Sequence, residues 1–190
     1  EFFIISKVFY HHLRYKDVLN AAERSLKRLQ LKHIDLYLIH WPNPKIPVDE
    51  TINALENLID NGKVRYMGVS NFCVTQLQEA MKSARKYEIV ANEIKYSALD
   101  RNSFRQEEEL LPFARENNVR VIAYTPLETG DVSTALLREL ALKYDKTVNQ
   151  VGLNYLICQG AVPIPKSQRE EHLRENLGAL GWRLSKEDVE

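Results

Sequence analysis

Six short apolar runs alternate with amphipathic stretches along this chain, and the alternation constrains the fold more than any other feature. The runs are rich in strand-forming residues, whereas the stretches between them place apolar residues at helical spacing. Such an order predicts parallel strands joined by right-handed crossovers. The predicted strands are Phe2 to Lys7, Ile34 to His40, Val64 to Ser70, Ile89 to Ile94, Val119 to Tyr124 and Ala161 to Ile164.

Two of the intervening stretches show the helical pattern clearly. From Asp17 to Leu29, and again from Asp49 to Asn61, apolar residues recur every three or four positions. Each stretch would therefore pack one apolar stripe against the strands. Strands and helices in this order form either an open, doubly wound sheet or a closed barrel.

The position of a phosphate site separates these two architectures. An open dinucleotide-binding sheet carries a glycine-rich loop after its first strand, but Val8-Phe9-Tyr10-His11-His12 follows Lys7 here, without a glycine. A barrel binds phosphate after its last strands, where this chain reads Ile164-Pro165-Lys166-Ser167. We therefore expect barrel geometry, in a single domain over residues 1–190.

Composition disfavours several classes of function. The 26 basic and 26 acidic residues cancel, which leaves no overall field to hold a polyanion, so no nucleic-acid partner is expected. No apolar run is long enough to cross a bilayer. Cys73 and Cys158 match no metal-ligand spacing, so we expect free thiols in a reducing cytoplasm and no metal site.

The run from Asp35 to Pro42 brings an imidazole to the end of a buried strand. Chemistry in parallel α/β barrels takes place at the carboxyl ends of the strands, where His40 could donate a hydrogen bond to a carbonyl oxygen. The pattern alone fits a core histidine bonded to backbone equally well. Lys7 ends an apolar run in the same way, and by itself it reads as a strand-end lysine that reaches water.

Three strand ends together resemble those of the aldo-keto reductases. They are Ser6-Lys7, His40-Trp41-Pro42 and Gly68-Val69-Ser70-Asn71-Phe72. They match the third, fourth and fifth strands of the family barrel, and the resemblance extends over almost the whole chain. It implies an incomplete (β/α)8 TIM-barrel fold with about six parallel strands, the family's third to eighth.

On this alignment the family's first two βα units, which carry its catalytic Tyr and Asp, would precede Glu1. The other end also reads as truncated, because Ser185 is placed to begin a helix, with Asp188 three residues later, just before the chain stops. Six strands cannot close an eight-stranded barrel. We expect the open edges to be covered by a second copy, by rearranged end segments or by a smaller closed sheet.

The resemblance implies catalytic roles for Lys7, which would tune the pKa of the family's proton-donating Tyr, and His40, which would orient the substrate carbonyl. Trp41 would line the substrate pocket beside His40. The implied cofactor contacts form a larger set. They are Ser70, Asn71, Glu93, Tyr124, Thr125, Pro126, Leu127, Lys166, Ser167, Arg169, His172, Glu175 and Asn176.

Within that set, Ser70 and Asn71 would hold the nicotinamide carboxamide and Tyr124 would stack on the ring. The alternatives are a helix N-cap made by Ser70 or Asn71 and a core tyrosine before a turn. Lys166 and Ser167 would bind a 2′-phosphate, and Glu175 with Asn176 would read the adenine. By contrast, Glu107-Glu108-Glu109 reads as the solvated start of a helix.

Two positions depart from the family pattern. Glu93 stands where the family usually has Gln, and an ionised carboxylate accepts hydrogen bonds but cannot donate them. His172 stands where Arg is common, and a neutral imidazole is a weaker phosphate partner, although Arg169 lies nearby in sequence. NADP is therefore the expected cofactor and NAD the alternative.

The function that the resemblance implies is an NAD(P)H-dependent oxidoreductase that reduces aldehydes or ketones to alcohols in the cytoplasm. Because the proton-donating Tyr and its Asp partner find no match in residues 1–190, we expect little or no turnover by this chain. Two other functions stay open: a non-catalytic dinucleotide-binding or assembly module, and a barrel lyase or isomerase with Lys7 as a Schiff-base amine.

Overall fold

The computed structural model describes residues 2–100, 105–127 and 134–190, except for the side chain of Gln106. Its strands form one parallel sheet in which each strand neighbours the next along the chain. The predicted parallel α/β architecture is thereby confirmed. The strands are β1 (Ile5–Val8), β2 (Ile34–Ile39), β3 (Val64–Ser70), β4 (Ile89–Lys95), β5 (Arg120–Tyr124) and β6 (Val162–Pro163).

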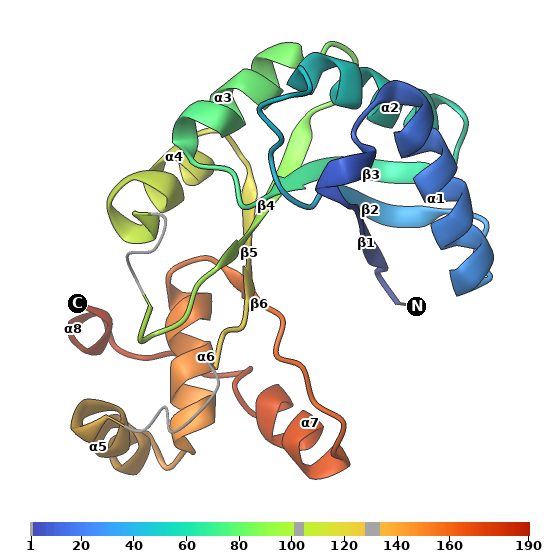
Figure 1. The fold of residues 1–190 in the computed structure, drawn as a ribbon. Coiled ribbons are helices and arrows are strands. Elements are labelled where there is room, and N and C mark those ends of the chain that lie inside the picture. Colours follow the sequence, from blue (N-terminus) through green and yellow to red (C-terminus); the bar gives the residue numbers. More distant parts are fainter. Residues whose placement is uncertain (1, 101–104, 128–133) are drawn as a thin grey trace. The chain divides into compact units, whose positions relative to one another are not determined.

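Helices follow the strands in the order that the sequence predicts (Figure 1). The short 3-10 helix Tyr10–His12 precedes α1, and the π-helix Gln106–Leu110 precedes α4. The α-helices are α1 (Tyr15–Leu29), α2 (Val48–Asp60), α3 (Val74–Ser83), α4 (Leu111–Glu116), α5 (Ala135–Tyr144), α6 (Val148–Cys158), α7 (Glu170–Leu177) and α8 (Lys186–Val189).

Contacts divide the chain into two compact units. The first unit comprises Glu1–Asn92 and Glu116–Val119, and the second unit comprises Glu93–Arg115 and Arg120–Glu190. The single domain over residues 1–190 stays a prediction. Among the described residues, no helix has the length and apolar character needed to cross a membrane.

The first unit is built on strands that are buried over most of their length. Every residue of β2 is buried, as is typical of strands in a parallel sheet. Helices α1 and α2 lie along one side of β1 to β3 (Figure 1). At the edge of the sheet the predicted first strand is too long, because Phe2 and Phe3 are 88% and 58% exposed and only residues 5–8 pair with β2.

A buried carboxylate joins the amino ends of the first strands. Asp35 accepts a hydrogen bond from the N–H of Ile4 at 2.8 Å and one from Arg65 at 2.9 Å. The bond from Ile4, with the nearby charge of Arg65, lowers the pKa of Asp35 although its burial opposes this. These contacts fix the pairing of β1, β2 and β3 at the end opposite to the predicted site.

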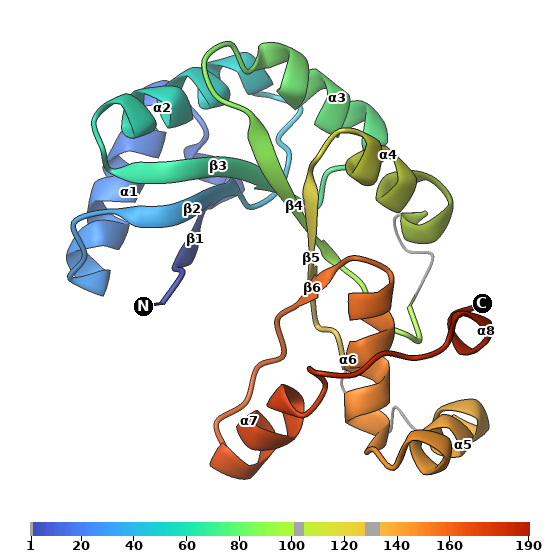
Figure 2. The same ribbon diagram turned by 180° about the vertical axis from the view of Figure 1, so that it is seen from behind.

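In the second unit the segments around α6 are connected through polar side chains. Figure 2 shows the chain after α7 passing α6 on its way to α8. Asn154 on α6 is fully buried and donates to the carbonyls of Ala179 and Trp182, both at 2.9 Å. Its Oδ1 accepts from the N–H of Leu184 at 3.0 Å. One amide thus satisfies three backbone groups of the segment between α7 and α8.

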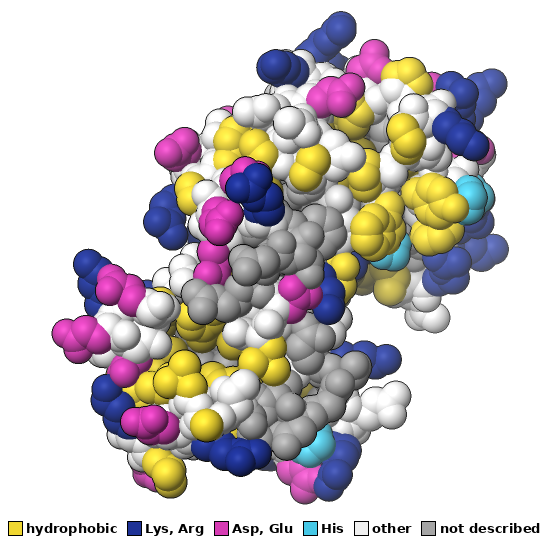
Figure 3. Space-filling model, turned by 60° about the vertical axis from the view of Figure 1, so that its left-hand side comes forward, with side chains coloured by type: hydrophobic (Ala, Val, Ile, Leu, Met, Phe, Trp, Pro, Cys, Tyr) yellow, Lys and Arg dark blue, Asp and Glu magenta, His cyan; other side chains and the backbone are white. Residues whose placement is uncertain are grey.

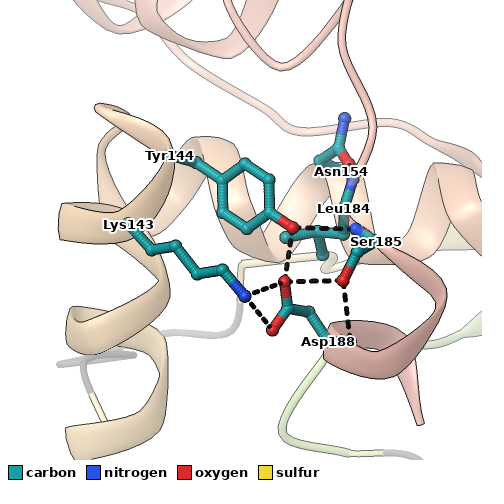
Figure 4. Close-up of polar contacts among 6 residues, drawn as sticks. All are labelled: Lys143, Tyr144, Asn154, Leu184, Ser185 and Asp188. Carbon is teal, nitrogen blue, oxygen red and sulfur yellow. Dashed lines mark hydrogen bonds and ion pairs between the residues drawn. The ribbon is translucent and has the colours of Figure 1, made fainter.

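A second polar cluster connects α5 to α8 (Figure 4). The carboxylate of Asp188 accepts hydrogen bonds from Lys143, Tyr144 and Ser185. The hydroxyl of Ser185 in turn accepts from the N–H of Asp188, so Ser185 is the N-cap of α8, as predicted.

The last strand is shorter than predicted. The sequence predicts a strand over residues 161–164, but only Val162–Pro163 form β6.

Charged side chains of both signs are scattered over the face drawn in Figure 3. This mixture agrees with the equal numbers of basic and acidic residues in the chain. Two expectations stay predictions: that the protein has no nucleic-acid partner, and that it is located in the cytoplasm.

Candidate active site at the carboxyl ends of the strands

Strand pairing places three predicted residues on one face at the carboxyl ends of the first unit's strands. Lys7 is level with Leu38, and Leu38 is level with Gly68. His40 and Ser70 follow Leu38 and Gly68 by two positions each, and side chains along a strand repeat every two residues. Lys7, His40 and Ser70 therefore project to the same side of the sheet. The N–H of His40 continues the ladder to the carbonyl of Val8 at 3.0 Å.

Asn71 forms the turn that ends β3. Its φ of 62° lies in the left-handed region, which Asn tolerates better than most residues. Its amide donates to the carbonyl of His40 and to the hydroxyl of Ser70, both at 3.0 Å. Asn71 thus connects the backbone after β2 to the end of β3, and it is only 4% exposed.

Asn92 is a residue that sequence reasoning missed. It is fully buried on β4 and donates to the carbonyl of Phe72 at 2.8 Å, so it holds the segment after the Ser70-Asn71 turn. The signal that could have revealed it is an amide inside an otherwise apolar strand, because such a group must find a partner.

The alternative in which Ser70 or Asn71 caps the next helix is wrong. Helix α3 begins after Cys73, whose N–H donates to Gln76 at 3.1 Å in a capping box. Because Asn71 uses its amide to close the turn, the cap falls two residues later. Burial raises the pKa of the Cys73 thiol, but hydrogen bonds with Thr75 and Gln76 outweigh it, so the net pKa is lowered.

An aromatic ring packs against His40, and an exposed indole follows it in sequence. The ring of Phe9 meets the imidazole edge-on, with centroids 5.8 Å apart. The side chain of Trp41 is 41% exposed, which contradicts a core role and leaves it free to contact a ligand. His40 itself is half-buried, so its side chain packs against Phe9 and is still partly exposed to solvent.

In the second unit, Glu93 and Tyr124 lie on neighbouring strands. Glu93 is 1% exposed, and Tyr124 is half-buried at the end of β5. Burial raises the pKa of Tyr124, and Lys95 opposes this while Glu93 and Asp100 add to it. Lys95 and Asp100 form an ion pair at 3.0 Å.

Thr125, Pro126 and Leu127 continue from β5. Thr125 has a φ of 51°, so the chain turns sharply directly after Tyr124. Pro126 is buried, whereas Thr125 and Leu127 are half-buried. The structure therefore places these three residues at the strand end where the resemblance predicts cofactor contacts.

The expectation of a solvated acidic helix start is wrong for Glu107. This carboxylate lies in the π-helix before α4 and accepts hydrogen bonds from Tyr96, at 2.8 Å, and from Tyr155. Tyr96 is fully buried, and its burial raises the pKa of the hydroxyl far above the usual range. Glu107 thus connects β4 to α6 through two tyrosines, a role that no local pattern indicates.

The predicted phosphate and adenine residues follow β6. Lys166 and His172 are exposed, and Ser167 forms a local turn by accepting from the N–H of Arg169 at 3.1 Å. Arg169 also forms an ion pair with Glu171. Lys166 is therefore open to a ligand, whereas the Ser167 hydroxyl is bonded to the backbone of Arg169 and the Arg169 guanidinium has an acidic partner.

The two residues predicted to read the adenine have other contacts in this structure. Glu175 accepts hydrogen bonds from Thr147 at 2.7 Å and from Asn149 at 3.3 Å, which join α7 to the start of α6. Asn176 lines an apolar cavity of about 700 Å³ with Leu173 and Leu177. Within the described residues, no cluster of His, Cys, Asp or Glu could hold a metal ion.

Comparison with known proteins identifies the family. The sequence profile of the Aldo/keto reductase family matches residues 1–136 and 132–190. Glyoxal reductase of Bacillus subtilis is 38% identical over the whole chain, which covers 67% of that protein. The 9,11-endoperoxide prostaglandin H2 reductase of Trypanosoma cruzi is 36% identical, again over the whole chain, with 66% of its length covered.

Solved structures agree with this match. The thermostable aldo-keto reductase Tm1743, in complex with epalrestat, superposes with a TM-score of 0.92 at 42% identity, over 98% of this chain and 69% of that one. An aldo/keto reductase from Klebsiella pneumoniae in complex with NADP and acetate gives 0.88 at 33% identity, over 98% and 67%.

The fold and the strand ends define part of a (β/α)8 barrel of the oxidoreductase type. The chain belongs to the Aldo/keto reductase family, whose members use NAD(P)H, and it spans about two thirds of the length of the relatives it matches. The resemblance drawn from the three strand ends is thereby confirmed.

Proposed function

We propose that this chain carries the carbonyl-orienting and cofactor-binding residues of an NAD(P)H-dependent reductase of small aldehydes and ketones. The observation that supports it most directly is the strand register, which puts Lys7, His40 and Ser70 on one face at the carboxyl ends of β1 to β3. His40 would donate a hydrogen bond to the carbonyl oxygen and stabilise the charge that develops there. Lys7 would supply positive charge beside it.

The described residues fit the cofactor. In the first unit, Ser70 is a fully buried hydroxyl at a strand end, and Asn71 holds it through its amide. In the second unit, Tyr124 offers a half-buried ring for stacking, and Lys166 offers an exposed cation for a phosphate. When bound, the nicotinamide would supply hydride. NADP is the proposed cofactor and NAD the alternative.

The relatives support the proposed substrate class. Two of them are a glyoxal reductase of Bacillus subtilis and a methylglyoxal reductase of Escherichia coli. We propose small aldehydes and ketones for this chain, with the exposed indole of Trp41 as a pocket wall. Residues 1–190 alone are expected to turn over little substrate, because a general acid typically contributes about 10²- to 10⁴-fold and its family position has no match here.

A binding and turnover experiment tests this proposal. NADPH is titrated into the chain while its fluorescence is followed, and NADPH oxidation is then measured with methylglyoxal. We expect saturable binding with turnover near background. Absence of binding would overturn the cofactor role, and rapid turnover would overturn the expected low activity. Binding without any turnover also fits a non-catalytic dinucleotide-binding module. A His40→Ala variant whose cofactor binding is unchanged would agree with that alternative.

The lyase or isomerase alternative makes a different prediction for Lys7. A Schiff base between its amine and a carbonyl substrate would be reduced by borohydride to a stable secondary amine. Mass spectrometry of the chain after incubation with methylglyoxal and borohydride, with Lys7→Arg as control, separates it from a reductase. We expect no adduct specific to Lys7.

We further propose that the chain associates with a second copy through its sheet edge. Strand β1 is at one end of the strand order, and Phe2 and Phe3 beside it are strongly exposed. Unpaired edge strands with exposed apolar residues favour association. Light scattering is expected to report a dimer that Phe2→Ser with Phe3→Ser weakens, whereas monomer at every concentration would overturn this proposal.

A further inference from the structure

A buried amide on β4 is hydrogen-bonded to the backbone just beyond the end of β3. The side chain of Asn92 donates to the carbonyl of Phe72 at 2.8 Å, and its oxygen accepts from the N–H of Phe72 at 3.5 Å. Both residues are buried, and both belong to the first unit. Solvent therefore cannot replace these contacts if the amide is removed.

This amide pairs with Phe72 as a neighbouring strand would. Strand β3 ends at Ser70, and the left-handed φ of Asn71 turns the chain, so Phe72 lies outside the strand. A carboxamide offers one carbonyl and one N–H group, as a peptide group does, and can bond both backbone groups of a single residue. Asn92 thus extends the hold of β4 on this segment to two residues past the end of β3.

The turn at Asn71 is held from both sides. Its own amide donates to the carbonyl of His40 and to the hydroxyl of Ser70, which connects the turn to the end of β2. Asn92 holds the following residue, Phe72, on the side of β4. A left-handed conformation at a residue other than glycine is strained and persists only where the surroundings fix it. Asn92 supplies part of that fixation.

We propose that Asn92 is a positioning residue for the nicotinamide end of the cofactor. The inference rests on the proposed function, in which the turn of Ser70 and Asn71 holds the nicotinamide carboxamide. Hydrogen bonds weaken steeply when their distance and angle are disturbed, so a displaced turn would bind the carboxamide less well. Asn92 acts through the turn and touches no part of the cofactor. The adenine and 2′-phosphate contacts proposed for the second unit are independent of it.

Equilibrium binding of two ligands tests this without turnover. NADPH carries the nicotinamide, whereas adenosine 2′,5′-bisphosphate carries the adenine and the 2′-phosphate without it. Calorimetry gives both dissociation constants for the natural chain and for Asn92→Ala. We expect NADPH to bind roughly tenfold more weakly in Asn92→Ala, as the loss of about one hydrogen bond would produce, and the bisphosphate to stay within about twofold.

A matched control variant lies in the same unit. Glu56 is also buried, and its carboxylate accepts from the N–H groups of Arg85 and Lys86 at 2.8 and 2.6 Å. These two residues precede β4, so they lie at the end of the strands opposite to the candidate site. Glu56→Ala likewise removes a buried side chain with two backbone partners, but it should leave both dissociation constants unchanged. Urea unfolding compares the stability that the two variants lose.

A second variant serves if Asn92→Ala does not fold. Asn92→Thr places a β-branched side chain in the strand, and its hydroxyl is one atom shorter than the amide, so it cannot bond both backbone groups of Phe72. The ratio Kd(NADPH)/Kd(bisphosphate) should again rise.

The outcomes distinguish this inference from the function on which it rests. Equal weakening of both ligands in the Asn92 variants, a change in neither, or the same rise of the ratio in Glu56→Ala overturns the positioning role, and the proposed function stands. If the natural chain does not bind NADPH, the proposed function fails and this inference fails with it.

Discussion

Each of the two units is stabilised internally by a different kind of contact. In the first unit, backbone pairing between buried strands fixes the geometry, and all six residues of β2 are buried. In the second unit, side chains such as Asn154, Glu107 and Asp188 make the decisive contacts between segments. A unit held mainly by backbone pairing depends less on any single polar side chain, whereas one held by buried side-chain hydrogen bonds depends on single residues.

The largest expected effect is in the second unit, at Asn154. Asn154→Leu would leave the carbonyls of Ala179 and Trp182 and the N–H of Leu184 without their partner. Each buried unsatisfied group costs about 1–3 kcal/mol, so we expect the free energy of unfolding to fall by about 3–5 kcal/mol. Urea unfolding measures this. Asn61→Ala, at an exposed helix end, should cost less than about 1 kcal/mol, and equal losses would contradict the proposed difference.

The first unit should be most sensitive at Gly68, where backbone packing leaves no space. A Cβ there would lie 2.6 Å from the carbonyl oxygen of Ala91 and 2.8 Å from Leu38. Gly68→Ala is expected to destabilise the chain by about 1–3 kcal/mol in the same assay. Gly152→Ala on α6 meets nothing closer than 3.9 Å and should stabilise by up to about 1 kcal/mol. A harmless Gly68→Ala would argue against tight pairing of β3 with β4.

Acid should weaken the second unit through Asp188. Hydrogen bonds from Lys143, Tyr144 and Ser185 lower the pKa of Asp188 to about 2. A lowered folded-state pKa contributes stability above the ordinary Asp pKa of about 4, and this contribution is lost as the pH falls through about 2. The melting temperature should therefore fall less steeply between pH 5 and 2 in Asp188→Asn than in the natural chain. Parallel curves would show that the cluster in Figure 4 adds no stability.

The smallest expected effect concerns binding rather than stability. Lys166 is exposed after β6, so Lys166→Ala should leave the unfolding midpoint unchanged. It should weaken NADPH a few-fold and NADH hardly at all, because only NADPH carries the 2′-phosphate. Fluorescence titration with both cofactors measures this, and Lys186→Ala, which removes a lysine that is 91% exposed on α8, is the matched control. Equal loss for NADPH and NADH would assign Lys166 to another part of the cofactor.

Sequence by itself was sufficient for the alternation of strands and helices and for the residues at the strand ends. The strand from Val64 to Ser70 is predicted to the residue, because period and composition are local properties of the chain. Lys7, His40 and Ser70 could be selected for the same reason, since a strand's carboxyl end can be read from where its apolar run stops.

Only the tertiary structure decided which polar residues support the fold. The amide of Asn154 meets Ala179 and Leu184, which are 25 and 30 positions away, and Glu107 meets Tyr155 across 48 positions. No periodic pattern encodes such partners, because a hydrogen bond depends on where distant segments meet in space.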